Sequence, residues 1–262
     1  MKNIAIVIPC YNESKRLDPL AITAFARSHP SVIFIMVDDG STDNTLEIIE
    51  RMRENLDGQV TCVSLGSNSK KAEAVRQGFL AAFKMPVEHI GYWDADLATP
   101  LYHIDEMAAA FDDPLIEIVM GSRVRLLGRN IRRGLFRHFS GRVYATFASM
   151  VLRMLAYDTQ CGAKLFRNTE QTQKIFSFPF TTKWVFDVEI LARAIVYNRE
   201  KKTGCDPNLF CVEYPLHEWI DKKGSKRKAV DYFFSVLDLI KVYGILTFKK
   251  KGSEYINRLA GE

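Results

Sequence analysis

The sequence predicts an α/β fold in which helices flank a mostly parallel β-sheet. The first observation is that short apolar segments alternate with segments of helical periodicity in the first half of the chain. The second is that these apolar segments are nearly continuous, as in parallel strands that are buried on both faces. Five such strands are predicted, at residues 4–8, 32–37, 60–65, 89–93 and 117–121.

Length and composition are those of a globular protein. A chain of 262 residues can bury a sizeable core, and 47% hydrophobic and 26% charged residues argue against disorder. The five cysteines form no C-x-x-C pair, which fits a reducing, cytoplasmic compartment and argues against a cysteine metal cluster. The apolar stretch in "MKNIAIVIPCYNE" is too short for a signal peptide, so it is interpreted as the first strand.

Two helices are predicted between these strands. The clearest covers residues 43–56, where Asp43 or Asn44 can cap the helix and Glu47 lies three residues after Asn44. Its apolar residues form one stripe, which consists of Leu46, Ile49, Met52 and Leu56. A second helix is predicted over about 71–83. Parallel strands joined through helices require right-handed crossovers, which again favours a parallel sheet.

Polar side chains collect where the predicted strands end. "PCYNES", "DDGSTD", "DADLAT" and "GSR" follow the first, second, fourth and fifth strands. Ligands of such sheets bind beyond the carboxyl ends of the strands, so the four segments predict one site. Asp94 and Asp96 project to the same side if they continue a strand, and something must offset their repulsion. The alternative for this pair alone is a solvated turn.

The second half of the chain is basic and amphipathic. Residues 125–142 hold six arginines among apolar residues, and a mostly apolar helix is predicted over 143–157. This pattern is typical of a membrane-surface or anion-binding element, or of a helix packed on the sheet with a solvated basic face. Near the C-terminus, "KKGSKRK" at 222–228 precedes a helix with only a narrow polar stripe, so most of that helix is expected to be buried in protein or at a bilayer interface.

Eight motifs together resemble family 2 glycosyltransferases, and most of all the dolichyl-phosphate β-glucosyltransferase branch, which acts on polyprenyl phosphates. They are "IPCYNE", "VDDGSTDNT", "KAEAVRQG", "DADLATP", "GSR", "DTQCGAKLF", "WVFDVEIL" and "HEWIDKKGSK", and the resemblance extends to about residue 245. It implies a GT-A fold, which is a Rossmann-like nucleotide-binding sheet. The implied division is a GT-A domain at 1–228, with a nucleotide part at 1–123 and an acceptor part at 124–228, followed by an amphipathic C-terminal helix and tail at 229–262.

The resemblance also implies a divalent metal, Mg²⁺ or Mn²⁺, held by Asp94 and Asp96. Such a metal would neutralise the nucleoside diphosphate that leaves the sugar, and hard carboxylate oxygens suit it. Asp96 is the firmer ligand, Asp94 assists through the metal or the ribose, and Ala95 lies in the donor site between them. Ala98 stands where the mannosyl branch often has glutamine, so water is expected to complete the metal shell.

Other donor-site residues follow from the same motifs. The resemblance assigns Pro9, Tyr11 and Glu13 to the pocket under base and ribose, and Asp39 to the edge of the base, while Asp38 is interpreted as structural. The resemblance also assigns Lys71 to the donor site as the lysine of the family's N-x-G-K-G loop, and Lys226 is expected to close over the diphosphate. The loop before Lys71 departs from the family because Lys70 and Ala72 replace usual glycines.

The acceptor side is expected to be cationic. A polyprenyl phosphate is largely ionised near pH 7, so it needs positioning more than a strong base. The resemblance assigns four cations to its phosphate, namely Arg123, Arg133, Arg137 and Lys164. Asp158 and Gln160 should line the reaction centre with Lys164. Asp187 is expected to be either a catalytic base or a group that orients arginine or sugar hydroxyls.

The function implied by the resemblance is inverting transfer of a hexose from a nucleotide sugar to a polyprenyl or dolichyl phosphate, with glucose from UDP-glucose expected from the branch. Two alternatives stay open: a family 2 enzyme with a saccharide or protein acceptor, for which Asp187 would be an obligatory base, and a noncatalytic nucleotide-sugar-binding protein. Nucleic-acid binding is not expected, because aromatics do not interleave the basic clusters. Eukaryotic members of the branch have an N-terminal membrane anchor, whereas this sequence predicts neither such an anchor nor a transmembrane segment. We therefore expect peripheral binding to the cytoplasmic membrane face.

Overall fold

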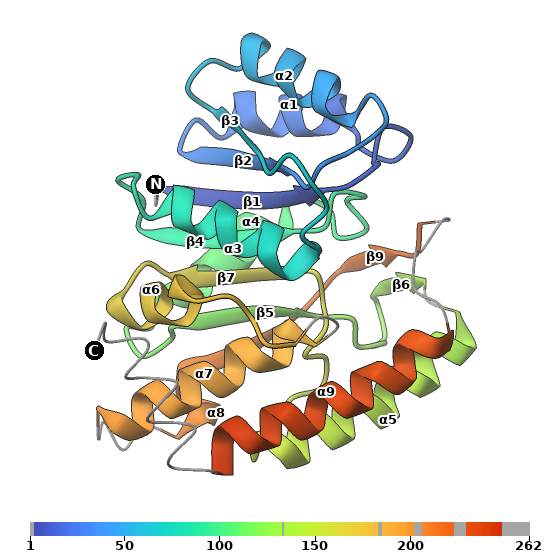
Figure 1. The fold of residues 1–262 in the computed structure, drawn as a ribbon, viewed down its shortest axis with the longest axis vertical. Coiled ribbons are helices and arrows are strands. Elements are labelled where there is room, and N and C mark those ends of the chain that lie inside the picture. Colours follow the sequence, from blue (N-terminus) through green and yellow to red (C-terminus); the bar gives the residue numbers. More distant parts are fainter. Residues whose placement is uncertain (1–2, 133, 183–184, 202–205, 223–228, 248–262) are drawn as a thin grey trace.

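A seven-stranded sheet forms the centre of the computed structural model, which describes residues 3–132, 134–182, 185–201, 206–222 and 229–247 (Figure 1). Its strand order is β3-β2-β1-β4-β7-β5-β8. The strands are β1 (Ile4–Cys10), β2 (Val32–Asp38), β3 (Val60–Ser64), β4 (His89–Trp93), β5 (Ile118–Ser122), β7 (Ala163–Arg167) and β8 (Cys211–Pro215). A small parallel pair consists of β6 (Asn130–Arg132) and β9 (Glu218–Ile220).

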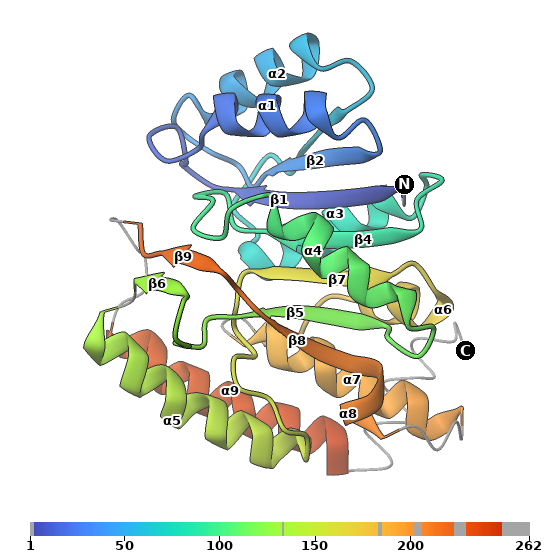
Figure 2. The same cartoon turned by 180° about the vertical axis from the view of Figure 1, so that it is seen from behind.

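Helices cover both faces of the large sheet (Figures 1 and 2). One face packs against α1 (Pro19–Ser28), α2 (Thr45–Asn55) and α4 (His103–Ala108), which leads into the 3-10 helix η1 (Ala109–Asp112). The other packs against α3 (Lys71–Ala82), α6 (Glu170–Ser177) and α7 (Phe186–Glu200). The remaining helices are α5 (Leu135–Leu152), α8 (Pro207–Phe210) and α9 (Ala229–Thr247).

Burial on both faces explains the continuous apolar strands. Along β1, Ala5 and Val7 belong to the core under α3, whereas Ile6 and Ile8 belong to the core under α1 and α4. Alternate residues of a strand point to opposite faces, so each face must find apolar partners. The predictions of five strands, of helices at 43–56 and 71–83 and of a mostly parallel sheet are confirmed.

One strand that the sequence did not predict changes the arrangement of the sheet. β7 lies between β4 and β5 and runs antiparallel to both, so β5 is not the neighbour of β4. In this register Ala163 at the start of β7 pairs with Trp93 at the end of β4. Because β7 is reversed, the loop that precedes it arrives at the carboxyl edge of the parallel strands. This brings "DTQCG" to the predicted site.

The basic segment at 125–142 is not one helix. It passes through an irregular stretch and β6 before α5 begins, and the helix predicted over 143–157 ends at Leu152. α5 and α9 lie side by side in both views, and α9 also packs on α7 (Figures 1 and 2). Among the described residues, no helix combines the length and apolarity that crossing a membrane would require. The division of the chain at residues 123 and 228 stays a prediction.

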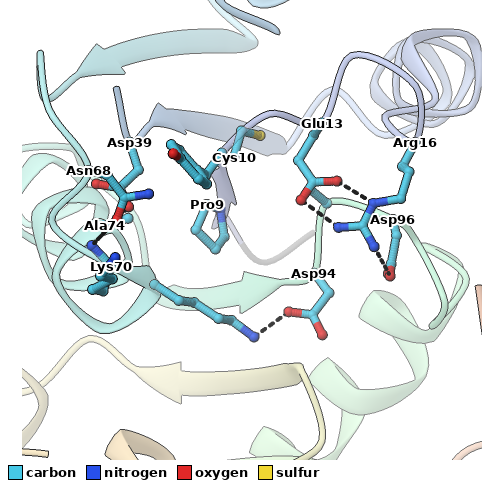
Figure 3. Close-up of a pocket in the computed structure, with 13 residues that line it drawn as sticks. Pro9, Cys10, Glu13, Arg16, Asp39, Asn68, Lys70, Ala74, Asp94 and Asp96 are labelled. Atoms are coloured by element: carbon cyan, nitrogen blue, oxygen red, sulfur yellow. Dashed lines mark hydrogen bonds and ion pairs between the residues drawn. The ribbon is translucent and has the colours of Figure 1, made fainter. Parts of the chain in front are cut away.

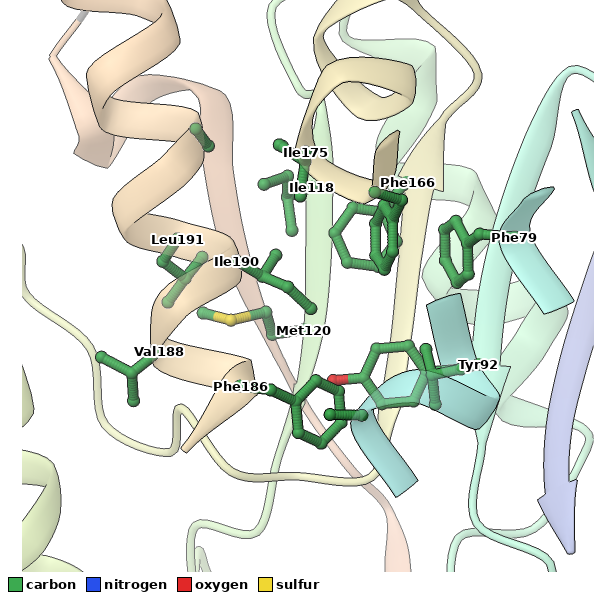
Figure 4. Close-up of a cluster of buried hydrophobic side chains, with 14 of the residues drawn as sticks. Phe79, Tyr92, Ile118, Met120, Phe166, Ile175, Phe186, Val188, Ile190 and Leu191 are labelled. Atoms are coloured by element: carbon green, nitrogen blue, oxygen red, sulfur yellow. The ribbon is translucent and has the colours of Figure 1, made fainter. Parts of the chain in front are cut away.

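An aromatic cluster ties α3 and α6 to the sheet (Figure 4). Phe79 is fully buried and stacks on Phe176, with ring centroids 3.7 Å apart and planes 10° from parallel. Phe79 also meets Phe166 of β7 edge to face at 5.5 Å. Such pairs contribute beyond their buried area. The cluster therefore holds the reversed strand and two helices together.

The turn into α3 has a strained backbone at Lys70. Lys70 has φ +78° and ψ 158°, a region that glycine occupies readily and other residues enter at a cost of about 1–3 kcal/mol. The glycine expected from the family pattern would therefore fit this conformation. The strained peptide aims the Lys70 N–H at the Asp39 carboxylate, at 2.9 Å. Lys70 thus adopts a backbone conformation that suits the glycine usual at this position.

We predict that Phe79→Ala destabilises the fold by about 3–5 kcal/mol, because it leaves a cavity between stacked rings that cannot collapse fully. Urea unfolding followed by fluorescence measures this. Leu20→Ala on α1 is the matched control, since Leu20 is 83% exposed and should lose less than about 0.5 kcal/mol. Equal losses for both variants would contradict the packing described for Phe79.

We predict that Lys70→Gly stabilises the protein by about 1 kcal/mol, because relief of the positive φ exceeds the entropy that glycine adds to the unfolded chain. Lys84→Gly, in the turn after α3 at an exposed residue without positive φ, should instead be neutral or destabilising. Denaturant unfolding of the two variants gives the comparison. Loss of stability in Lys70→Gly would contradict the strain.

Candidate active site

A pocket of about 400 Å³ opens at the carboxyl edge of β1, β2 and β4 (Figure 3). Seven predicted donor-site residues line it together with the predicted metal ligand Asp96, and the seven are Pro9, Tyr11, Glu13, Asp39, Lys71, Asp94 and Ala95. The sequence analysis did not assign five further lining residues, which are Cys10, Arg16, Asn68, Lys70 and Ala74. The strand ends therefore assemble one cavity, as expected.

Hydrogen bonds between two loops shape one side of this pocket. The Asn12 N–H donates to Ser41 Oγ at 3.0 Å, and Asn12 Oδ1 accepts from the Thr42 N–H at 2.8 Å. The Glu13 N–H donates to Thr45 Oγ1 at 2.8 Å, which joins the β1 loop to the start of α2. The loops after β1 and β2 are thus one unit. Asp38 is buried and accepts from the Ser41 N–H at 3.3 Å, in line with its structural interpretation.

Asp43 links the loop after β1 to the start of α2 by hydrogen bonds. Its carboxylate accepts from the Ser14 hydroxyl at 2.6 Å and from the Thr45 N–H at 3.1 Å. Burial works to raise the pKa of Asp43, but these hydrogen bonds prevail and lower it to about 2. Asn44 occupies the N-cap position of α2 without a side-chain capping bond. Asp43 instead accepts from the Thr45 N–H at the first turn of the helix.

Asp39 forms the opposite wall. Its two oxygens accept from the N–H groups of Ser69 and Lys70, at 2.6 and 2.9 Å. Burial raises the pKa of Asp39, and these hydrogen bonds reduce that rise. Each carboxylate oxygen can accept a second hydrogen bond, so the role at the base edge stays a prediction. The structure adds that Asp39 holds the loop carrying Lys70 and Lys71.

The two carboxylates in question, Asp94 and Asp96, each meet a side-chain cation. Asp94 Oδ1 accepts from Lys71 Nζ, and both side chains are 41% exposed. Asp96 Oδ2 lies 3.7 Å from a guanidinium nitrogen of Arg16 (Figure 3). Burial and the charge of Asp94 both raise the pKa of Asp96. Lys71 and Arg16 are therefore the neighbouring cations that offset the expected repulsion between Asp94 and Asp96.

Arg16 is held firmly on its other side. Its Nε and one terminal nitrogen donate to the two Glu13 oxygens at 2.7 and 2.5 Å, a bidentate pair that raises the pKa of Arg16. The spacing of three residues between Glu13 and Arg16 was the signal for this pair, since such residues meet on a helical turn. Glu13 thus positions a cation in the pocket.

The acidic pair has the donor chemistry for a hard divalent cation. It offers two carboxylates that already attract cations, within a pocket open to ligand. Among the described residues, no group of three or more His, Cys, Asp or Glu side chains is arranged to hold a metal. A metal here would take its remaining ligands from a diphosphate and water, an arrangement typical of Mg²⁺. The residues therefore fit such an ion.

Gly162 is the residue that lets the loop before β7 approach Asp94. A Cβ at this position would lie 1.9 Å from Asp94 Oδ2. The Asp94 N–H donates to the Gly162 carbonyl at 2.9 Å, so the close approach is fixed by backbone. The glycine of "DTQCG" is therefore a space requirement of the acidic pair. Gln160, predicted in the reaction centre, is half-buried in this loop.

Arg123 and Asp158 form a bidentate pair after β5. Arg123 donates from Nε and a terminal nitrogen to the Asp158 oxygens at 2.6 and 2.7 Å, and stands 5.3 Å from the Trp219 ring. Burial alone would lower the pKa of Arg123. The charge of Asp158 and its hydrogen bonds act in the opposite direction, and the net result is a raised pKa. Asp158 is itself held by its N–H, which donates to Glu213 Oε1 at 2.6 Å. The predicted acceptor arginine is thus rigidly oriented by the "DTQCG" loop.

Lys164 and Asp187 form a second pair, below the surface. Lys164 is completely buried and donates to Asp187 Oδ1 at 2.6 Å and to the Cys161 carbonyl at 2.7 Å. The Tyr92 hydroxyl also donates to Asp187. Burial would raise the pKa of Asp187, but Lys164 and Lys71 lower it. The expectation that Lys164 reaches an acceptor phosphate does not match this placement, because its ammonium is enclosed and paired.

Asp187 is buried and accepts hydrogen bonds from both Lys164 and Tyr92, a placement that suits orienting another group, while the choice between its two expected roles stays a prediction. Three other predicted residues cannot be placed. Arg133 and Lys226 lie outside the described residues. Arg137 lies in the first turn of α5, but its side chain is outside the described part of the chain.

Comparison with known proteins agrees with this geometry. The model of glycosyl transferase family 2 matches residues 5–191. The dolichyl-phosphate beta-glucosyltransferase of Saccharomyces cerevisiae is 31% identical over 261 residues, covering 90% of this chain and 73% of that protein. The dolichyl-phosphate beta-glucosyltransferase of Homo sapiens is 30% identical over 72% of this chain and 62% of that protein.

Solved structures share the fold. Glucosyl-3-phosphoglycerate synthase from Mycobacterium tuberculosis, in complex with Mn²⁺, UDP and glucosyl-3-phosphoglycerate, has a TM-score of 0.60 at 18% identity, covering 93% of this chain and 80% of that one. The mannosyltransferase PcManGT from Pyrobaculum calidifontis, in complex with GDP-Man and Mn²⁺, has a TM-score of 0.58 at 13% identity, covering 99% and 75%. At these identities the likeness concerns the fold alone. Since the family model covers well over half of the sequence, the chain belongs to glycosyl transferase family 2 and has the GT-A fold of its glycosyltransferases.

Proposed function

We propose that this glycosyltransferase transfers glucose, with inversion, from UDP-glucose to a polyprenyl phosphate such as dolichyl phosphate. The observation that carries the proposal is the donor-sized pocket with a cation-binding carboxylate pair, in a chain similar over 90% of its length to a dolichyl-phosphate beta-glucosyltransferase. The similarity supports the sugar and the acceptor. The charges in the pocket support a nucleoside diphosphate.

The donor half follows from the residues around the pocket. Pro9 and Tyr11 lie where a base and ribose can rest, and Asp39 offers acceptor oxygens to the base edge. Bound between Asp94, Asp96 and the diphosphate, Mg²⁺ or Mn²⁺ would neutralise the charge that develops on the leaving group. Lys71 and Arg16 add positive charge in the same cavity. Together these groups stabilise departure of the nucleoside diphosphate.

The acceptor half needs orientation of a phosphate rather than its deprotonation. A phosphate monoester is mostly dianionic above its second pKa of about 6, so its oxygen can attack the sugar carbon directly. The pKa of Asp187 lies below its usual value, which agrees with a reaction that has no strong base. Arg123 is the acceptor cation, because its guanidinium has five N–H donors and the bidentate pair with Asp158 uses two.

The lipid part of the acceptor would meet the protein at α5 and α9. The two helices expose large apolar side chains to solvent, with Val143, Phe147 and Met150 of α5 between 55 and 69% exposed. On α9, Ile240 is 63% and Tyr243 50% exposed. This supports peripheral binding of the paired helices to a bilayer interface. The sequence predicts that most of the last helix is buried in protein or at a bilayer interface. A bilayer would cover the apolar side chains of α9 that the protein leaves exposed.

The test is a transfer assay with purified protein, a short polyprenyl phosphate, Mg²⁺ and radiolabelled UDP-glucose, GDP-mannose or UDP-N-acetylglucosamine. We expect a lipid-extractable product with UDP-glucose. Asp96→Ala should lower the rate of glucose transfer by more than about 100-fold. Loss of a group that only supports a metal ligand costs about 10–100-fold, so a direct ligand should cost more. Asp57→Ala, which removes an exposed carboxylate distant from the pocket, is the control and should keep the rate.

Each outcome selects one function. No lipid product, with soluble saccharide or protein accepting the sugar, would replace the polyprenyl phosphate and make Asp187 the next residue to vary. Donor binding without transfer to any acceptor would favour a noncatalytic nucleotide-sugar-binding protein. Full activity of Asp96→Ala would remove the assignment of the metal site.

Membrane binding is tested by flotation with vesicles that contain about 30% anionic lipid. We expect the protein to float with them and to dissociate as salt increases, because salt screens the attraction between basic side chains and anionic lipid. Phe147→Ser with Met150→Ser should reduce flotation about fivefold or more, through loss of buried apolar area. Leu20→Ser on α1 should have no effect. Equal flotation of both variants would exclude the α5–α9 surface.

A further inference from the structure

We propose that Lys71 is an exchangeable counter-ion of the acidic pair: it occupies Asp94 until a divalent metal arrives, and then transfers to the diphosphate of the donor. The proposal rests on the proposed function, since it concerns the same donor pocket. It makes metal and nucleotide binding mutually dependent. The argument depends on how differently Lys71 and Arg16 are held.

Arg16 is the fixed cation. Two short hydrogen bonds tie it to Glu13, whereas its approach to Asp96 is a looser 3.7 Å. A metal at Asp96 could weaken that contact without moving Arg16, because Glu13 keeps the guanidinium in place. Arg16 therefore stays a constant part of the pocket.

Lys71 is the movable cation. It is 41% exposed at the start of α3, and its ammonium sits at the end of a flexible four-carbon chain. Its ammonium also lies 6.0 and 5.9 Å from the ring centroids of Tyr92 and Phe186, and its charge helps to lower the pKa of Asp187. Rings at this distance attract a cation but do not replace a carboxylate as its counter-charge. A metal at Asp94 takes away the carboxylate that accepts from Lys71, and Asp187 is already paired with Lys164, so a further anion in the pocket would attract Lys71.

The diphosphate supplies that anion in the same cavity, which Lys71, Asp94 and Asp96 line together. Metal alone must compete with Lys71 for Asp94. A diphosphate alone meets two carboxylates, which repel it. Binding of each ligand therefore removes an obstacle to the other, and such coupling acts equally in both directions.

The experiment measures Mn²⁺ affinity by the electron paramagnetic resonance signal of free Mn²⁺, with and without UDP, and UDP affinity by calorimetry with and without Mn²⁺. Lys71→Met should bind Mn²⁺ alone about fivefold or more tightly than the wild type, because the competing charge is gone. The same variant should bind UDP more weakly in the presence of Mn²⁺. The factor by which UDP tightens Mn²⁺ binding should fall about fivefold or more.

Two variants separate charge from side-chain loss. Lys71→Arg keeps the charge and should retain the wild-type order of affinities, while Lys84→Met removes a lysine beyond α3 and should change neither affinity more than about twofold. Unchanged or weaker Mn²⁺ binding in Lys71→Met, with Mn²⁺ and UDP both binding to the wild type, would overturn the exchange alone. A wild-type protein that binds neither ligand would overturn the proposed function as well.

Discussion

The pairing of β7 antiparallel to β4 is the constraint on which the rest of the site depends. It places Ala163 beside Trp93, so that the preceding loop ends against the acidic pair. The Gly162 carbonyl then receives the Asp94 N–H, and the missing side chain at Gly162 leaves room for the carboxylate. A parallel β7 would bring this loop to the opposite edge of the sheet. The "DTQCG" loop meets the acidic pair only because this strand is reversed.

The same strand carries a buried charge into the core. Lys164 on β7 pairs with Asp187 at the start of α7, and Tyr92 of β4 donates to the same carboxylate. Breaking a buried pair by removing one partner leaves an uncompensated charge, which is costly. This network therefore fixes α7 relative to β4 and β7 immediately beneath the pocket. The network therefore also supports the surface on which Lys71 and Asp94 meet.

Both carboxylates of the acidic pair have a cationic neighbour before any ligand enters. Burial and the charge of Asp94 raise the pKa of Asp96, and Lys71 and Arg16 compensate for the charge of the two carboxylates. Glu13 in turn compensates for Arg16. A ligand that brings both a dication and a diphosphate leaves the net charge of the pocket nearly unchanged, whereas either one alone changes it. The electrostatics of the pocket thus support the proposed binding of a metal together with a nucleotide.

The sequence by itself determined the five strands, the helices at α2 and α3 and the edge where the site lies, because burial on both faces and helical periodicity are local patterns. It also determined the family and most of the donor pocket. Only the tertiary structure decided that Lys164 is enclosed, that Arg16 meets Asp96 and that β7 is reversed. These depend on contacts between distant segments, and periodicity carries no information about strand direction or the partner of a charge.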